Sequence, residues 1–172
     1  YGIDAVSYYL VSEVPFGENG TFTPEQFVMR INQDLANNLG NLLNRTVSML
    51  AQYYEGVIPA YVGAILPQDK ELEEAMEQTI VKFESLNDDL KVTEAYLEVM
   101  NLVSMANKYI QDTAPWALAK DESKKDELAS CMNHLARVLF EAGMLLKPIL
   151  ITKSDKIFDQ LGVPADKRIY EA

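Results

Sequence analysis

The fold of this chain is decided by residues 23–54, whose middle reads Asn32-Gln-Asp-Leu-Ala-Asn-Asn-Leu-Gly-Asn-Leu-Leu-Asn-Arg45. The start has the pattern of a helix N-terminus, because Thr23 can cap, Pro24 needs no N–H at the first helical position, and Gln26 completes a capping box. Apolar residues then recur at helical spacing, at Val28, Ile31, Leu35, Leu39, Leu42, Leu43, Val47 and Leu50. The stretch therefore predicts one long amphipathic helix that ends near Gly56.

Polar residues of the same helix gather on one side. At about 100° per residue, a band about 80° wide beside the apolar stripe contains Arg30, Asp34, Asn38, Asn41 and Arg45. Asparagine is a mediocre helix former, so several of them indicate side chains kept for contacts. The spacing leaves open whether those contacts are with neighbouring helices or with a partner. Gly40 inside the helix costs about 1 kcal/mol against alanine, which predicts a close helix crossing there.

The composition limits the classes of protein to which the chain can belong. Its 172 residues fit one domain, and a net charge of −11 disfavours a broad phosphate-binding surface. Arg30 and Arg45 are the only basic residues before Lys70. The single cysteine, Cys131, predicts a reducing, cytoplasmic setting and is expected to be a small buried hydrophobe. The single histidine, His134, is expected to be structural or on the surface. The sequence contains no run of 18 or more apolar residues, so it predicts no membrane-spanning helix.

The remainder of the chain predicts further helices with short connections. They are expected over residues 2–12, 67–86, 91–112, 121–147 and 157–161. In the first of these, Ile3, Val6, Tyr9 and Leu10 share one side, and the glycines and prolines that follow predict a loop. Residues 87–89 and 152–155 are expected to cap the helices after them. The predicted architecture is an all-α bundle of about five main helices.

No catalytic, cofactor-binding or metal-binding pattern is present. The sequence lacks HExxH, CxxC, GxGxxG and GxxxxGK[ST], and its cluster of carboxylates over residues 71–77 is expected to be solvated. Trp116, the only tryptophan, follows Pro115 at a helix end and is either a core plug or a platform for a partner. Together with Asn41 and Arg45 it could bind a single-stranded RNA loop, because an indole stacks on bases and amide and guanidinium groups bond their edges.

Several stretches resemble the methionyl-tRNA synthetase family over nearly the whole chain. The similarity is carried by Tyr1-Gly-Ile-Asp-Ala-Val-Ser-Tyr-Tyr-Leu10, Val14-Pro-Phe-Gly17, Gly20-Thr-Phe22, Asp34-Leu-Ala-Asn-Asn-Leu-Gly-Asn-Leu-Leu-Asn-Arg45 and Ala114-Pro-Trp116. Related chains usually have Asp-Ala-Leu-Arg near the start, whereas this one has Asp4-Ala-Val-Ser7. The missing arginine affects a contact with a catalytic domain more than it affects RNA binding.

The resemblance implies a class I aminoacyl-tRNA synthetase of which residues 1–162 are the helical anticodon-binding domain and residues 163–172 a tail or linker. It implies that Asn41, Arg45 and Trp116 read the CAU anticodon of a tRNA and that Pro115 shapes the pocket, with Asn38 and Asn107 as further candidate contacts. The catalytic domain, with its ATP and metal ions, is expected to precede Tyr1. This piece itself is expected to be monomeric.

Two alternatives remain at this point. The chain could be the equivalent helical domain of another class I synthetase, such as those for leucine, valine or cysteine. It could also be a non-enzymatic helical scaffold whose asparagine and arginine band binds a protein.

Overall fold

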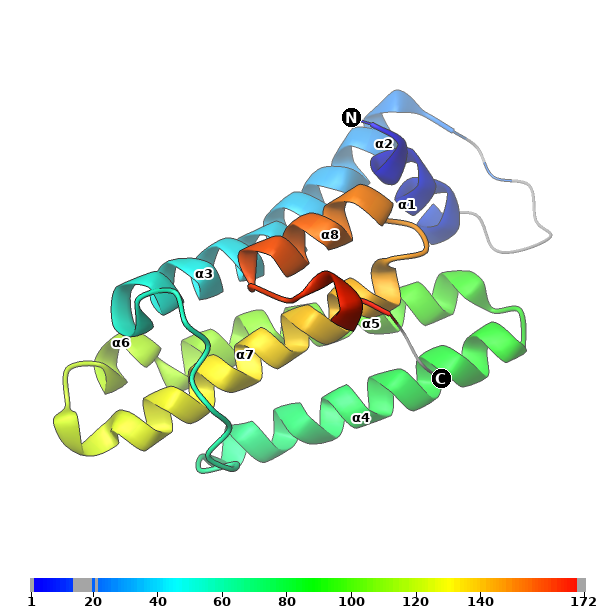
Figure 1. The fold of residues 1–172 in the computed structure, drawn as a ribbon. Helices are drawn as coiled ribbons and strands as arrows, with labels where there is room; N and C mark the ends of the chain where they lie inside the picture. The colour runs from blue at the N-terminus through cyan, green and yellow to red at the C-terminus, as the bar shows by residue number, and fades with distance from the viewer. Residues whose placement is uncertain (1, 14–19, 21, 170–172) are drawn as a thin grey trace.

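The computed structural model describes residues 2–13, 20 and 22–169, which contain helices but no strand (Figure 1). In chain order, the elements are α1 (Ile3–Glu13), α2 (Pro24–Arg30), the π-helix η1 (Ile31–Gly40), α3 (Asn41–Tyr54), α4 (Pro67–Asp88), α5 (Val92–Thr113), α6 (Pro115–Leu118), the 3-10 helix η2 (Glu122–Lys124), α7 (Lys125–Leu146), α8 (Ile151–Gln160) and the 3-10 helix η3 (Ala165–Lys167). The predicted all-α bundle is confirmed. The loop predicted around residues 15–19 lies outside the described residues.

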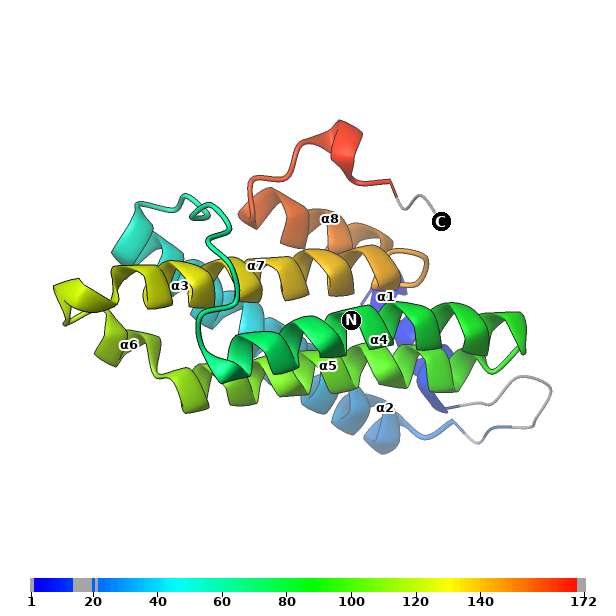
Figure 2. The same ribbon diagram turned by 90° about the horizontal axis from the view of Figure 1, so that it is seen from below.

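Helices α5 and α7 form the centre of the bundle. Their buried apolar side chains recur at helical spacing and include Val99, Leu102, Val103, Ala106 and Ile110 in α5 and Met132, Leu135, Leu139, Ala142 and Leu146 in α7. Helix α4 packs along α5, and α8 packs on α7 (Figure 2). The elements α2, η1 and α3 form one continuous rod that contacts α5 through η1 and both α5 and α7 through α3.

The rod is continuous, as predicted, but it is not α-helical throughout. Over Ile31–Gly40 the backbone forms a π-helix, in which the hydrogen bonds span five residues. The close helix crossing expected at Gly40 is wrong, because, apart from the adjoining backbone, the only described atoms within 4 Å of a Cβ there belong to Leu35 of the same helix, with its carbonyl oxygen at 2.9 Å. Periodicity could not reveal the π-helix, since apolar residues at i, i+4 and i+8 fit both kinds of helix.

The two predicted helix caps are wrong. Helix α8 begins at Ile151, so residues 152–155 lie inside it. Its cap comes from α1, where Asp4 Oδ2 accepts hydrogen bonds from the N–H groups of Thr152 and Lys153 at 3.0 and 2.8 Å. Residues 87 and 88 end α4, and the residue before α5 is Lys91, which makes no side-chain cap. Sequence spacing does not detect a cap supplied by a distant helix.

Helix α1 packs through only part of its predicted apolar side. Of that side, Ile3, Val6 and Leu10 are exposed and only Tyr9 is buried. Ala5 and Tyr8 are buried with it and complete the surface of α1 that faces the bundle. Within the residues that the structure describes, no helix is both long enough and apolar enough to span a bilayer.

Candidate nucleic-acid interface

The first part of the polar band connects the rod to α1. Arg30 Nε donates a hydrogen bond to Glu13 Oε1 at 2.9 Å, and Asp34 Oδ2 accepts one from the hydroxyl of Tyr8 at 2.7 Å. Burial, followed by the charge of Asp34, raises the pKa of Tyr8 well above its ordinary value. The interpretation of the band as contacts between helices is therefore confirmed for these residues.

Asn38 connects the rod to α5. Its Nδ2 donates to Ser104 Oγ at 2.8 Å and to the carbonyl oxygen of Met100 at 3.2 Å. In return, Asn107 Nδ2 donates to the carbonyl oxygen and to Oδ1 of Asn38, at 3.1 and 3.0 Å. Asn38 and Asn107, both candidate contacts, thus bind each other. No sequence pattern relates residues 69 positions apart, so this pairing was not predicted.

Asn41 and Arg45 differ from the residues before them in having little to bind. Asn41 is exposed, and its Nδ2 makes one long contact of 3.4 Å with Asn107 Oδ1. The other arginines form ion pairs with Glu13, Glu73, Asp155 or Asp159. Among the described residues Arg45 has no such acidic partner. Its five N–H donors are therefore available to a ligand.

Trp116 is the second residue of the short helix α6, which follows α5 after a single residue. Ala114 adopts a left-handed conformation, with φ of 45°, and ends α5. Pro115, which is buried, then begins α6, where its fixed φ suits a first helical position. The Trp116 side chain is 43% exposed, so its interpretation as a core plug is wrong. A half-exposed indole held by a buried proline can present its face to a planar partner.

The fold brings α3 and α6 to the same end of the bundle (Figure 1). The contact between Asn41 and Asn107 joins α3 to α5, and from Asn107 the helix α5 continues for less than two turns to Ala114 and α6. Past this contact, Arg45 is one turn further along α3. The end of α3, helix α6 and the start of α7 also line a common hollow of about 580 Å³.

A second polar cluster lies beneath the loop over residues 55–66, which crosses α7. Asp69 of α4 is fully buried and accepts hydrogen bonds from the hydroxyls of Tyr109 and Ser130, both at 2.6 Å. It also accepts from the N–H groups of Ile65 and Leu66, both at 2.9 Å. Burial by itself raises the pKa of Asp69, but these hydrogen bonds lower it below its ordinary value.

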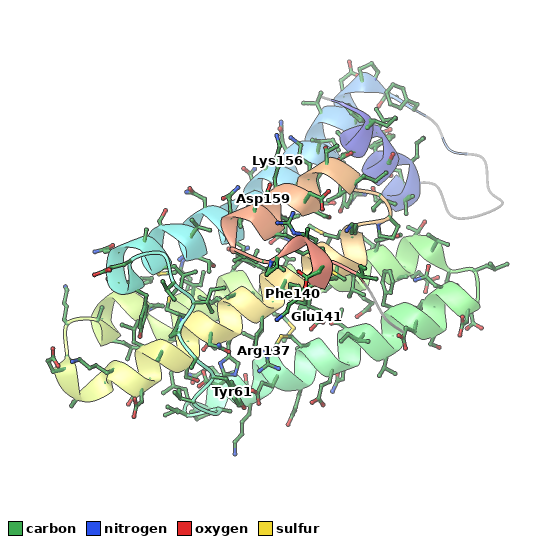
Figure 3. The ribbon with its side chains drawn as sticks, viewed as in Figure 1. Tyr61, Arg137, Phe140, Glu141, Lys156 and Asp159 are labelled. Carbon is green, nitrogen blue, oxygen red and sulfur yellow. The ribbon has the colours of Figure 1, made fainter. Side chains whose placement is uncertain are left out.

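His134 and Glu73 extend this cluster to the surface. His134 is fully buried, with Nδ1 2.6 Å from the carbonyl oxygen of Ser130 and Nε2 2.9 Å from Glu73 Oε1. Glu73 also accepts from Tyr61 at 2.9 Å and pairs with Arg137 at 3.2 Å. Figure 3 labels Tyr61 and Arg137, which lie near each other on this side of the bundle. The structural role expected for His134 is confirmed. The expectation that every carboxylate near the start of α4 is solvated is wrong for Glu73.

Ser130, His134 and Glu73 resemble a hydrolase triad in composition but do not act as one. Ser130 Oγ is 3.3 Å from His134 Nδ1, yet its hydroxyl already donates to Asp69 and lies 2.8 Å from the carbonyl oxygen of Gly63. The side chain is completely buried, so no substrate reaches it. The cluster joins the loop over residues 55–66 to α4, α5 and α7.

Cys131 is buried, as predicted, and its thiol is expected to be unreactive. Burial raises the pKa of its thiol to about 11, so the reactive thiolate is scarce at neutral pH. Within the described ranges, no group of three or more histidine, cysteine or acidic side chains is arranged to hold a metal ion.

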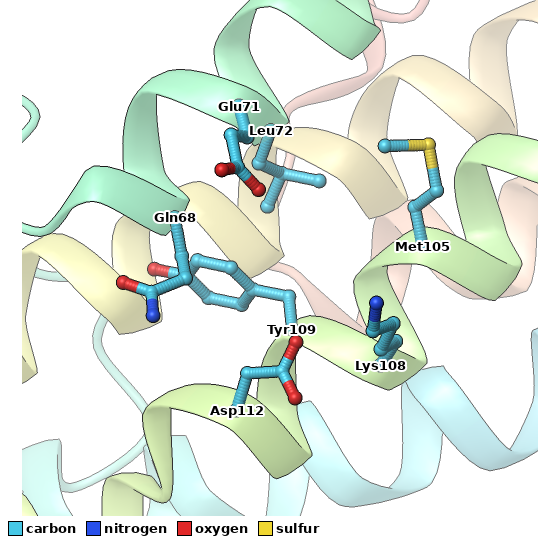
Figure 4. Close-up of a pocket in the computed structure, with 7 residues that line it drawn as sticks. All are labelled: Gln68, Glu71, Leu72, Met105, Lys108, Tyr109 and Asp112. Carbon is cyan, nitrogen blue, oxygen red and sulfur yellow. The ribbon is translucent and has the colours of Figure 1, made fainter.

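Neither the hollow beside α6 nor two further cavities are lined by the predicted site residues. A small one of about 120 Å³ lies between α4 and α5, with Lys108, Glu71 and Asp112 at its edge and the ring of Tyr109 among its lining residues (Figure 4). A cavity of about 390 Å³ between α4 and α7 is lined by Glu141, Arg137 and apolar residues. Burial raises the pKa of Glu141 to about 7, and its Oε1 is buried without a hydrogen-bond partner.

Comparison with known proteins supports the family suggested by the motifs. A family model described as the anticodon binding domain of methionyl tRNA ligase matches residues 58–170, and one described as tRNA synthetases class I (M) matches residues 1–47. The methionine–tRNA ligase of Enterococcus faecalis is 48% identical over 163 residues, which are 95% of this chain and 24% of that protein. That of Listeria monocytogenes is 50% identical over the same share of this chain.

A solved structure agrees with this result. Mycobacterium tuberculosis methionyl-tRNA synthetase in complex with methionyl-adenylate matches with a TM-score of 0.90 and 32% identity, over 96% of this chain and 33% of that one. The helical bundle is thus a domain of the kind found in class I aminoacyl-tRNA synthetases. More narrowly, the chain belongs to the family of methionyl-tRNA ligase anticodon-binding domains. It spans about a quarter of the length of the curated relatives it matches.

Proposed function

We propose that this chain recognises the CAU anticodon of a tRNA as the anticodon-binding domain of a methionine–tRNA ligase. The observation that carries the proposal is the half-exposed indole of Trp116 on α6, a helix at the same end of the bundle as α3, whose Asn41 and Arg45 have few or no partners. The family membership of the chain supports the same conclusion.

Recognition in this proposal combines stacking with hydrogen bonding. One anticodon base stacks on Trp116, a contact worth about 1–3 kcal/mol, while Asn41 and Arg45 bond to base edges. Pro115 holds the indole, and Asn38 and Asn107 border the contact area. A wrong base leaves an amide or guanidinium group without a partner, at a cost of about 1–3 kcal/mol.

The remaining functions belong to the whole ligase. We propose that it attaches methionine to its tRNA in the cytoplasm, using ATP and metal ions bound in a catalytic domain that packs against this one. Residues 1–162 are the anticodon-binding domain, which acts as a monomer, and residues 163–172 are a tail. The start of this tail lies along α8, where Arg168 donates to the carbonyl oxygen of Val163 and to Asp159.

Replacement of Trp116 by alanine tests the proposal. The Trp116→Ala chain should bind a CAU anticodon stem-loop about 10- to 100-fold more weakly than the original chain, because base stacking is lost. Trp116→Phe should retain part of the affinity. In the complete ligase, Trp116→Ala should reduce tRNA charging and leave methionyl-adenylate formation unchanged.

Three results would contradict the proposal. Equal binding of stem-loops with CAU and with altered anticodons would exclude anticodon recognition by this chain. Loss of adenylate formation together with charging would exclude a role for Trp116 in anticodon binding. A protein partner with no stem-loop binding at low salt would favour a scaffold instead.

A further inference from the structure

The π-helix η1 ends immediately before Asn41. In a π-helix each residue turns the chain through less than the roughly 100° of an α-helix, so the rotation of every later side chain about the rod axis is changed. Segments of this kind are uncommon and often occur at functional sites. The direction in which Asn41 and Arg45 point is therefore set by the ten residues that precede them.

Gly40 is the residue that permits this geometry at its junction with α3. Its φ of −64° and ψ of −38° are ordinary for any residue, so backbone freedom does not explain the glycine. Space does explain it: a Cβ would lie 2.9 Å from the carbonyl oxygen of Leu35, a separation that real Cβ atoms essentially never show. The obstructing atom is backbone of the same helix and cannot move without changing the π-helix itself.

Asn107 of α5 contacts the junction between the π-helix η1 and α3. The change from π- to α-helix alters the hydrogen bonding of the carbonyl groups there, and the carbonyl oxygen of Asn38 accepts from the N–H of Asn41. It also accepts from Asn107 Nδ2 at 3.1 Å, while Asn107 Oδ1 accepts from Asn41 Nδ2 at 3.4 Å. One side chain of α5 thus contacts the backbone of the junction and the first residue after it.

We propose that Gly40 and Asn107 are positioning residues for anticodon recognition. Gly40 allows the π-helical register, and Asn107 fixes the junction, so that Asn41 and Arg45 emerge at the rotation that a base edge requires. An α-helical rod of the same sequence would turn these two side chains to another direction. This inference rests on the function proposed for Asn41 and Arg45.

The Gly40→Ala chain tests the inference. Alanine favours a regular α-helix, so the variant should keep its helicity but bind the CAU stem-loop about tenfold or more weakly. Its preference for CAU over a stem-loop with one altered anticodon base should fall by a similar factor. A simple loss of stability would instead weaken binding to both stem-loops equally.

Two matched variants separate positioning from stability. Gly143→Ala also adds a methyl group to a helical glycine, 2.8 Å from a Phe158 ring atom, but this clash lies between α7 and α8. Asn44→Ala changes an exposed asparagine one residue before Arg45. Both should retain the preference for CAU. The Gly40→Ala, Asn107→Ala double variant should lose little more than either single one, because both act through the same junction.

A measurement without RNA keeps the inference distinct from the proposed function. The side-chain amide NMR signals of Asn38 and Asn107 should shift in Gly40→Ala and stay in place in Asn44→Ala. If the original chain shows no preference for CAU, the proposed function fails, and these signals still decide whether Gly40 sets the junction. Unchanged signals, or wild-type affinity and preference in Gly40→Ala, would overturn the inference.

Discussion

The two polar clusters of this domain differ in how completely their hydrogen-bonding groups are satisfied. Beneath the loop over residues 55–66, Asp69 accepts four hydrogen bonds, and Glu73 is bound by His134, Tyr61 and Arg137. At the other cluster, Asn41 makes one long contact and Trp116 is half-exposed. The first cluster connects parts of the fold, and the second remains available to a ligand.

The difference shows why residue type alone does not identify a site. An isolated serine, histidine and glutamate constellation suggests catalysis, yet here burial and mutual bonding make it structural. Conversely, asparagine and arginine on a helix suggest ordinary surface polarity until their lack of partners is seen. A buried polar group without a hydrogen-bond partner strongly destabilises the fold. An exposed polar group bonds to water, so it can remain free for a ligand with little loss of stability.

The largest effect on stability is expected from Asp69→Asn. This change places an amide group where a carboxylate accepts four hydrogen bonds. Unfolding free energy should fall by about 3 kcal/mol, because buried donors lose their acceptor while the shape is kept. Urea titration measures this change. The folded pKa of Asp69 is lowered, so its stabilisation is present above pH 3.8 and is lost as the pH falls through that lowered pKa. The difference in unfolding free energy between Asp69→Asn and the original chain should therefore become smaller as the pH falls.

Asp69→Asn should leave the preference for CAU intact at temperatures where the variant is folded. A Tyr109→Phe control, which removes one of the four donors to Asp69, should cost about 1 kcal/mol. A loss below that value for Asp69→Asn would show that the cluster does not hold the fold together.

For Arg45→Ala we expect the opposite result from Asp69→Asn, a loss of RNA affinity with stability retained. Affinity for the CAU stem-loop should fall about 10- to 100-fold, because the guanidinium donors to the base edge are removed. Stability should change by no more than about 0.5 kcal/mol, since no acidic partner is lost. Arg45→Lys keeps the charge without the planar fork and should restore only part of the affinity. Unaltered binding by Arg45→Ala would remove this residue from the site.

A smaller effect is expected from Glu141→Gln in the cavity between α4 and α7. Because burial raises the pKa of Glu141 to about 7, the stability supplied by its neutral form is complete below pH 4.5 and is lost as the pH rises through 7. Glutamine remains neutral, so at pH 8 the variant should gain about 1 kcal/mol, or about 2–4 °C in Tm. Thermal melts at pH 4 and pH 8 measure the effect, and an equal gain at both would contradict it.

The smallest effect is expected from Lys82→Ala, which removes an exposed pair with Glu98 at 3.3 Å. Such pairs contribute about 0–0.5 kcal/mol, so neither stability nor stem-loop binding should change measurably. A fall of more than about 1 kcal/mol in unfolding free energy would show that an exposed ion pair can stabilise the fold as much as a contact in the buried cluster around Asp69.

Much of the fold could be predicted from the sequence because its information is local. The apolar residues of α5 and α7 repeat at helical spacing, and Thr23 and Pro24 mark a helix start that the structure confirms, with Thr23 accepting from the N–H of Gln26. The pairing of Asn38 with Asn107 and the cap that Asp4 supplies to α8 could not be predicted. Each joins residues far apart in the chain, and a helical pattern carries no information about which faces will meet.

The candidate site shows the same division. Helical spacing places Asn41 and Arg45 in one polar band with Arg30, Asp34 and Asn38, and the resemblance to methionyl-tRNA synthetase selects these two together with Trp116 and Pro115. Whether the indole is buried or exposed was left open by the sequence, and the packing of α6 decided it.

By itself, the sequence determined that the chain is all-helical, where its long helices lie and which family it belongs to, because these depend on periodicity and on short motifs. The tertiary structure alone decided which polar groups satisfy one another and which remain free. It also decided that Asn107 binds the end of the π-helix, because the carbonyl of Asn38 and the amide of Asn107 meet only after α5 has packed against the rod.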